Sequence, residues 1–185
     1  MNIVIMGRQA AGKDTLSTNL ANNNGFSVIN TGDLYRKEYA ARTELGLLAY
    51  SYWGAGNICP DDITNKLMKN TISALNTNLI FNGYPRTAEQ AEYLDSLINI
   101  DLAIELCISE EEAIKRMLSR GRLDDTIDVI KVRLSVFNKN IIKIQEHYQK
   151  SGRLFSISTT HSEDQTSLSA QDILEKWKIS QQQKV

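Results

Sequence analysis

The chain contains 185 residues, of which 42% are hydrophobic and 23% charged, and its formal net charge at pH 7 is −1. This size and hydrophobic content allow one well-filled globular domain and exclude two large independent ones. A net charge close to zero excludes bulk attraction to nucleic acid or an anionic membrane, and no apolar run approaches the roughly 18 residues of a membrane span. We therefore expect a single domain over residues 1–185, without a nucleic-acid or membrane partner.

The N-terminus and the cysteines indicate the cellular compartment. The sequence enters a short apolar run at Ile3 without a basic leader, so we expect no cleaved signal peptide. Cys59 and Cys107 are far apart and lack the CxxC spacing of a metal site. These features predict a cytoplasmic protein without a disulfide, and we expect it to be a monomer.

Short apolar runs alternate with longer stretches of helical periodicity along the chain. Strands are predicted at residues 3–6, 26–30, 79–81, 102–108 and 154–157. Helices are predicted at residues 13–23, 34–53, 61–75, 88–98, 110–118, 128–149 and 169–178. A loop is predicted at residues 158–167, and the tail at residues 181–184 is expected to fray. The alternation predicts an α/β fold with a five-stranded parallel sheet flanked by helices and functional loops at the carboxyl ends of the strands.

The sequence GRQAAGKDT, at residues 7–15, follows the first predicted strand directly. It matches GxxxxGK, with Asp14 where the general motif has Ser or Thr. Its glycines allow several backbone N–H groups to face one phosphate, the following helix adds its positive end, and Lys13 reaches the β- and γ-phosphates. The alternative is an ordinary glycine turn, because the pattern arises by chance in roughly one chain in twenty of this length. Its position between a strand and a helix favours a phosphate-binding loop.

Three later segments narrow the interpretation. NTGDLYR at residues 30–36 resembles the STGDLLR segment of adenylate kinases, and GYPRTAEQA at residues 83–91 resembles their GFPRTxxQA segment. RLDD at residues 122–125, followed by Arg133, resembles their GRxDD-to-arginine spacing. Because the segments occur in order from about residue 3 to residue 157, nearly the whole chain resembles this family.

The resemblance implies a P-loop NTPase fold with two small excursions. These are a helical insertion for the nucleoside monophosphate at about residues 30–60 and a very short lid at about residues 116–133. It also implies a cis peptide bond between Tyr84 and Pro85. The implied reaction is reversible transfer of the ATP γ-phosphoryl to AMP, which gives two ADP, with Mg²⁺ bound together with ATP. Because the lid lacks a four-ligand cluster, we expect no structural zinc.

The family's site residues can be carried over to matching positions. Thr31 and Gln90 would read the adenine of AMP, and Arg116 would lie against the ATP base. The implied ATP-binding residues are Gly7, Ala10, Ala11, Gly12, Lys13, Asp14, Thr15, Arg116 and Arg120. The implied AMP-binding residues are Thr31, Arg36, Ile58, Gly83, Arg86, Gln90, Arg122 and Arg133. The implied catalytic residues are Lys13, Arg86, Arg120, Arg122 and Arg133.

Each arginine alone could be a solvated helix charge. As a set, the arginines between residues 116 and 133 repel one another unless something anionic lies between them. The attacking AMP phosphate is largely ionised at neutral pH, since its second pKa is about 6. Catalysis therefore requires only that cations align the donor with the acceptor and neutralise charge on the phosphoryl oxygens. No general base is needed.

The chain departs from the family pattern at three places. Asn82 stands where the family has an aspartate that holds the water shell of Mg²⁺, and Asp14 stands where the family has Gly. The metal is thus expected near Thr15, Asp14 and Asn82. Asp14 either complements the positive end of the helix or supplies the carboxylate that Asn82 lacks. Only Gly121 separates Arg120 from Arg122, so these two arginines can exchange roles.

Two alternative functions remain open on the sequence. Gln90 beside Thr31 favours AMP, because an amide can pair with an adenine edge and UMP or CMP kinases usually have Ala at the threonine position. Another acceptor, such as dAMP, UMP or CMP, is the enzymatic alternative. A nucleotide-binding regulatory protein with weak turnover is the non-enzymatic alternative, and Asn82 keeps it open.

Overall fold

The computed structural model describes residues 1–75, 78–122, 125–160 and 162–183. Within these residues lies a five-stranded sheet of order β2-β3-β1-β4-β5, in which all paired strands are parallel. The strands are β1 (Asn2–Gly7), β2 (Ser27–Asn30), β3 (Leu79–Asn82), β4 (Leu102–Cys107) and β5 (Leu154–Ser158). The predicted five-stranded parallel sheet is therefore confirmed.

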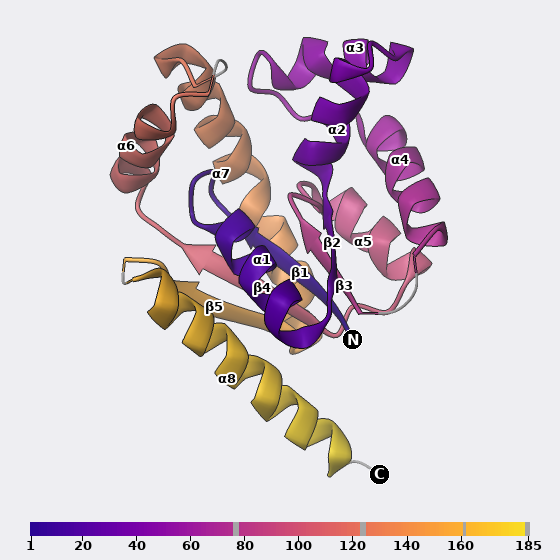
Figure 1. Cartoon of the computed structure of the whole chain (residues 1–185), viewed down its shortest axis with the longest axis vertical. Helices are drawn as coiled ribbons and strands as arrows, with labels where there is room; N and C mark the ends of the chain where they lie inside the picture. The colour runs from indigo at the N-terminus through magenta and orange to yellow at the C-terminus, as the bar shows by residue number, and fades with distance from the viewer. Residues whose placement is uncertain (76–77, 123–124, 161, 184–185) are drawn as a thin grey trace.

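Helices cover both faces of this sheet (Figure 1). They are α1 (Lys13–Asn24), α2 (Thr31–Ala40), α3 (Glu44–Trp53), α4 (Asp61–Ser73), α5 (Ala88–Leu97), α6 (Glu110–Arg120), α7 (Ile127–Lys150) and α8 (Glu163–Gln182). Side chains alternate along a strand, so β1 sends Ile3 and Ile5 to a core shared with α1 and α8. Val4 and Met6 point to the opposite core, which is shared with α4 and α5. Across the described residues, no helix is long and apolar enough to cross a membrane.

The predicted single helix at residues 34–53 is wrong, because the structure divides it into α2 and α3. The chain turns at Arg42, whose φ is +54°, and the Thr43 hydroxyl caps α3 by accepting a hydrogen bond from the Gly46 N–H at 3.0 Å. Helices α2 and α3 then pack so closely that a Cβ at position 46 would lie 2.2 Å from the Glu38 carbonyl carbon. Helical periodicity runs through this turn, which is why the pattern concealed it.

The predicted loop at residues 158–167 is too long. Helix α8 begins at Glu163, where the Ser162 side chain accepts a hydrogen bond from the Gln165 N–H, and it continues to Gln182. The helix predicted at residues 169–178 is thus too short at both ends, and Gln181 is helical rather than frayed. The end of the predicted tail, at residue 184, lies outside the described residues, as do Leu123 and Asp124 of the RLDD segment.

The strand order brings three chain segments to one edge of the sheet. Asn30 at the end of β2 is in register with Asn82 at the end of β3, and Asn82 is also in register with Ile5 of β1. The loop at residues 7–15 leaves β1 at the same edge. Figure 1 shows α2 and α3 on one side above this edge, and α6 with the start of α7 on the other. Side chains from all these segments can therefore meet above the strand ends.

On the opposite side of the molecule, Asp95 joins α5 to the end of α7 and the start of β5. Arg153 donates to both carboxylate oxygens of Asp95, at 2.9 and 2.6 Å, and His147 Nε2 lies 2.7 Å from Asp95 Oδ2. Burial opposes ionisation of Asp95, but the hydrogen bonds from Arg153 and His147 outweigh it and lower the pKa of this carboxyl. The ionised form therefore stabilises the fold.

We predict that Asp95→Asn lowers the free energy of unfolding at neutral pH by roughly 1.5 kcal/mol, the scale of a hydrogen bond to a charged group. Because the pKa of Asp95 is lower in the folded than in the unfolded state, its stabilisation is complete above about pH 4 and is lost as the pH falls through the folded-state pKa. Urea unfolding at neutral pH and in acid measures this. The exposed Asp172, paired with Lys176 on α8, provides the control Asp172→Asn, for which we expect little change. An Asp95→Asn effect of equal size at both pH values would contradict the assignment.

Candidate active site

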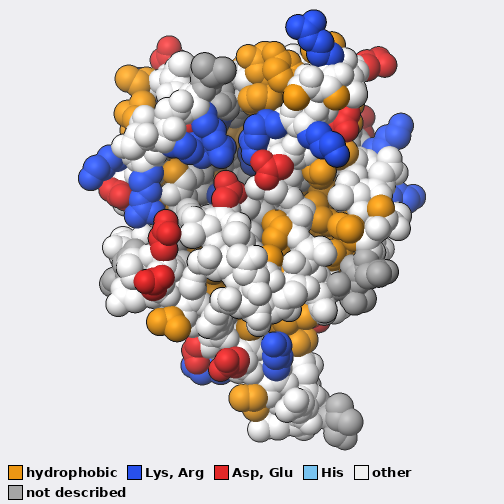
Figure 2. Space-filling model, in the orientation of Figure 1, with side chains coloured by type: hydrophobic (Ala, Val, Ile, Leu, Met, Phe, Trp, Pro, Cys, Tyr) orange, Lys and Arg blue, Asp and Glu red, His pale blue; other side chains and the backbone are white. Residues whose placement is uncertain are grey.

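A cleft of about 260 Å³ lies above the carboxyl ends of the strands. Six of the side chains that line it are cationic: Lys13, Arg36, Arg86, Arg120, Arg122 and Arg133. Figure 2 shows Lys and Arg side chains on both sides of this hollow. Of the residues predicted from the sequence, the cleft is also lined by Ala10, Gly12, Asp14, Thr15, Thr31, Ile58, Asn82, Gly83 and Gln90. The structure thus brings together predicted residues that are up to 123 positions apart, from Ala10 to Arg133.

The loop between β1 and α1 wraps around its own lysine. Lys13 Nζ donates to the carbonyl oxygens of Gly7 at 2.9 Å and Arg8 at 2.6 Å. Gly7 has a φ of +137°, and a Cβ there would lie 2.4 Å from the Leu106 carbonyl oxygen, so only glycine fits. Gly7 and the fully buried Ala11 do not line the cleft but support the loop from beneath. This geometry leaves the loop's remaining backbone N–H groups able to face an anion.

Lys13 lies among other cations. Burial is the main cause that lowers the pKa of Lys13 to about 7, and the charges of Arg86 and Arg120 add to it, whereas Asp14 opposes it. Without a ligand, the protein therefore favours the protonated form of Lys13 much less than water does. A bound phosphate would restore its ordinary preference for the charged form.

Asp125 is the anion between the arginines. Arg120 donates to both of its carboxylate oxygens at 2.9 Å, and Arg133 Nη1 donates to Oδ1 at 2.9 Å. Burial opposes ionisation of Asp125, but the hydrogen bonds and charges of the arginines outweigh it and lower the pKa of this carboxyl. The sequence indicated that an anion must lie between the arginines, and the protein's own Asp125 is one such anion. The sequence alone assigns no role to Asp125. Only the pairing across the turn between α6 and α7 identifies it.

The opposite wall of the cleft is built around Gly83. Thr31 Oγ1 and Arg86 Nε both donate to the Gly83 carbonyl oxygen at 2.8 Å. Gln90 Oε1 accepts from the Arg86 backbone N–H at 2.7 Å, and Gln90 Nε2 donates to Asp61 Oδ1 at 2.7 Å. The Tyr84–Pro85 peptide bond is cis, which confirms the expectation from the resemblance. These contacts fix Thr31, Arg86 and Gln90 relative to one another.

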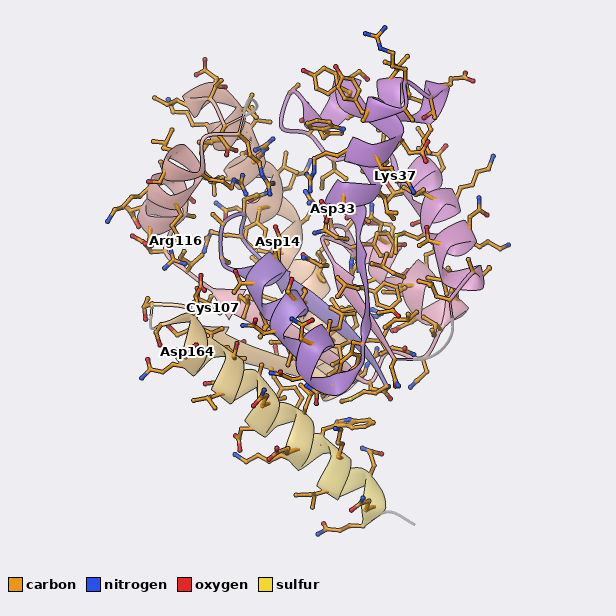
Figure 3. All side chains as sticks on the ribbon, in the orientation of Figure 1. Asp14, Asp33, Lys37, Cys107, Arg116 and Asp164 are labelled. Carbon is orange, nitrogen blue, oxygen red and sulfur yellow. The ribbon has the colours of Figure 1, made fainter. Side chains whose placement is uncertain are left out.

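Asp14 stands at the mouth of the cleft, at the start of α1 (Figure 3). Its Oδ1 accepts from Asn82 Nδ2 at 2.7 Å and from Asn30 Nδ2 at 3.1 Å. Its Oδ2 lies 3.7 Å from Arg122 Nη2. Two of the three departures from the family pattern, at positions 14 and 82, are therefore in direct contact.

Several aromatic and polar residues in the cleft wall were not predicted. Tyr35 and Cys59 form a small buried cluster with Ala49, against which Trp53 packs. The Tyr35 hydroxyl lies 2.8 Å from Thr64 Oγ1. The cleft is further lined by Gln9, Asn30, Gly32, Tyr35, Trp53, Gly56, Asn57, Cys59 and Thr64. The only sequence signal for Tyr35 was its place within the NTGDLYR segment.

Arg116 lies apart from the cleft. Its Nε donates to Glu112 Oε1 at 2.8 Å and its Nη2 to the Thr159 carbonyl oxygen at 3.1 Å. Figure 3 shows it on α6, on the outer side of the molecule from Asp14. Its contact with an ATP base stays a prediction.

The geometry described above agrees with comparisons with known proteins. The sequence model of the adenylate kinase family matches residues 5–153. The chain belongs to the adenylate kinase family. An adenylate kinase of Mycobacteroides abscessus is 36% identical over 156 residues, which cover 80% of this chain and 86% of that protein. One of Porphyromonas gingivalis (strain ATCC 33277) is 32% identical over 189 residues, which cover 96% of this chain and 97% of that protein.

Family membership confirms the resemblance and the P-loop NTPase fold, and it makes the protein a nucleoside monophosphate kinase. Adenylate kinases use Mg²⁺ together with ATP. The oxygen atoms of Thr15 and Asp14 beside the phosphate loop fit the oxygen preference of this ion. In the described part of the chain, no group of three or more His, Cys, Asp or Glu side chains could hold a metal by itself. The absence of structural zinc stays a prediction.

We predict that ATP binding at about pH 8 takes up roughly one proton, because the free protein holds Lys13 mostly neutral and the triphosphate favours its ammonium form. The sign follows from the lowered pKa of about 7: uptake is small at pH values below it and grows above it. Calorimetry in Tris and in HEPES measures the uptake as the difference between the two binding enthalpies. In a folded Lys13→Ala variant, we expect both the uptake and phosphoryl transfer to disappear. Equal enthalpies in the two buffers for the unaltered protein would contradict the prediction.

Proposed function

We propose that the protein transfers the γ-phosphoryl group of ATP reversibly to AMP and so forms two ADP. The observation that carries this proposal is the convergence of six cations on one cleft between the phosphate loop and the wall formed by Thr31, Arg86 and Gln90. One wall fits a triphosphate donor, and the other fits a monophosphate acceptor with its base. Cations between them suit a phosphoryl group in transit.

The donor side of the proposal rests on the phosphate loop. The loop backbone and Lys13 would hold the β- and γ-phosphates, with Thr15 and Asp14 on the side of the Mg²⁺ that accompanies ATP. When bound, Mg²⁺ supplies charge neutralisation on the phosphate oxygens. Arg120 uses Nε and Nη2 to bind Asp125, yet its guanidinium has five N–H donors. Asp125 would therefore orient Arg120 while other donors face the phosphoryl oxygens.

The acceptor side rests on the amide of Gln90. Its Oε1 accepts one hydrogen bond from the Arg86 N–H, and its Nε2 donates one to Asp61. A carbonyl oxygen has a second lone pair and an NH₂ group a second hydrogen, so both ends can still pair with an adenine edge. Thr31 would complete the contact with the base, and Arg36 and Arg86 would hold the AMP phosphate.

We further propose that residues 30–60 form the acceptor-binding insertion and residues 116–133 the lid. The loop after α3 already lies against α7, as a closed cleft requires. A Cβ at Gly56 would lie 2.8 Å from the Val129 carbonyl oxygen and 3.2 Å from the Val132 Cβ. Contact between the insertion and α7 would exclude water, the competing phosphoryl acceptor, when both nucleotides are bound.

A coupled assay with ATP and a panel of monophosphates tests the function. We expect the highest kcat/KM with AMP, lower values with dAMP, and much lower values with UMP and CMP, because a pyrimidine lacks the adenine edge that Gln90 would pair with. A higher kcat/KM with UMP or CMP would show that a pyrimidine nucleotide, and not AMP, is the acceptor. Nucleotide binding without turnover on any member of the panel would instead indicate a regulatory protein.

The acceptor assignment makes a sharper prediction. Thr31→Ala and Gln90→Ala should raise the KM for AMP by up to about tenfold and leave the KM for ATP unchanged, since each loses one neutral hydrogen bond to the base. Gln90→Ala should also lower the melting temperature, because it leaves Asp61 and the Arg86 N–H without this partner. Thr71→Ala on α4 is the matched control, because the Thr71 hydroxyl donates a hydrogen bond to the Leu67 carbonyl oxygen and Thr71 does not line the cleft. Equal increases in both KM values would show that the acceptor wall is assigned wrongly.

A further inference from the structure

We propose that Asp14 supplies the carboxylate that faces the Mg²⁺ of bound ATP, and that Asn82 acts as its support. This inference rests on the proposed binding of ATP and extends it to a residue of this chain. The carboxylate of the family pattern would thus have moved from position 82 to position 14 without leaving the site, because the two side chains are joined by a hydrogen bond of 2.7 Å.

The first support is the charge of the cleft. Asp14 is the single carboxylate among the described residues that line it, against six cationic side chains. Its side chain is 60% exposed at the mouth of the cleft and can meet a ligand without moving out of a packed core. A divalent cation bound to phosphate oxygens at this place would have this carboxylate as its nearest negative protein group among the lining residues.

The second support is the way in which Asp14 is held. Asn82, only 2% exposed, and Asn30 both direct an amide N–H₂ group at Asp14 Oδ1. Asn30 is itself fixed, because its Oδ1 accepts from the Gly32 N–H at 3.0 Å and caps α2. The amides therefore occupy Oδ1 and orient the carboxylate, while Oδ2 faces Arg122 at the longer distance of 3.7 Å. A donor-only pair of neighbours suits an ionised carboxylate.

The competing interpretation is that Asp14 only complements the positive end of α1. A carboxylate in that role faces the N–H groups of its own helix, whereas the contacts that hold Asp14 come from β2, β3 and the segment after α6. All three partners line the same cleft. Position 14 also follows the loop lysine, where the general motif presents an oxygen to the metal.

The proposal fixes the sign of a linkage between Mg²⁺ and ATP. Without the metal, the Asp14 carboxylate repels the triphosphate, and with the metal between them the interaction becomes attractive. Removing only the charge should therefore tighten the binding of metal-free ATP and weaken the binding of Mg-ATP. A residue that merely positions Asn30 and Asn82 would not produce opposite changes.

Asp14→Asn is the variant that isolates the charge, because its amide oxygen can still accept from Asn82 and Asn30. Calorimetry of ATP binding in EDTA and in excess Mg²⁺ gives a ratio, the dissociation constant in EDTA divided by the dissociation constant in Mg²⁺. We expect Asp14→Asn to reduce this ratio by about tenfold, the scale of one charge-assisted hydrogen bond. The double variant Asp14→Asn with Asn82→Asp should restore most of it. Asp33→Asn, an exposed carboxylate at the start of α2 (Figure 3), should leave the ratio unchanged.

The result that overturns the proposal is an unchanged ratio in Asp14→Asn with a normal melting temperature. Should Asp14→Asn fail to fold, Asp14→Gly provides the same comparison, and an unchanged ratio there has the same meaning. These measurements need neither an acceptor nor turnover. If the unaltered protein binds ATP neither in Mg²⁺ nor in EDTA, the proposed function is overturned as well. If it binds ATP with the same dissociation constant in both, only the role of Asp14 is overturned.

Discussion

Mutual repulsion among six cationic side chains governs the architecture of this cleft. The protein tolerates it through four arrangements: Asp125 binds Arg120 and Arg133, Asp14 faces Arg122, Asp33 binds Arg36, and Lys13 has its pKa lowered to about 7. None of these neutralises the cleft, so it retains a strong preference for an anionic ligand. The free energy of this unfavourable state is recovered when phosphate groups enter, which is how preorganised charge favours phosphoryl transfer.

The parallel sheet makes such a concentration of charge possible. Its carboxyl edge gathers loops from β1, β2 and β3, while the apolar residues of both faces anchor the strands in two separate cores. The cations then project from α1, α2, the segment after β3, the end of α6 with the segment that follows it, and the first turns of α7. Across the cleft, the loop after α3 lies close to α7 at Gly56.

Two departures from the family pattern, Asp14 and Asn82, are best understood together because their side chains are in contact. Considered singly, Asn82 removes a charge and Asp14 adds one near a triphosphate, and each would seem unfavourable for turnover. Their hydrogen bond shows that the carboxylate and the amide occupy one shared position beside the phosphate loop. Asn30 joins the same group and links it to the cap of α2, so the phosphate loop and α2 share a polar connection.

The sequence by itself determined the sheet, the phosphate loop and the family, because short-range periodicity and contiguous motifs encode these features locally. The cis bond before Pro85 followed from the resemblance to the family. The sequence missed the break at Arg42 and the early start of α8, where N-capping by Thr43 and Ser162 begins a helix inside an otherwise continuous periodic or polar pattern. Only the tertiary structure decided that Asp125 separates the arginines, that Arg116 lies outside the cleft, and that positions 14 and 82 touch. These facts depend on how β1, β3, α6 and α7 pack, and residues 68 positions apart carry no local signal of their contact.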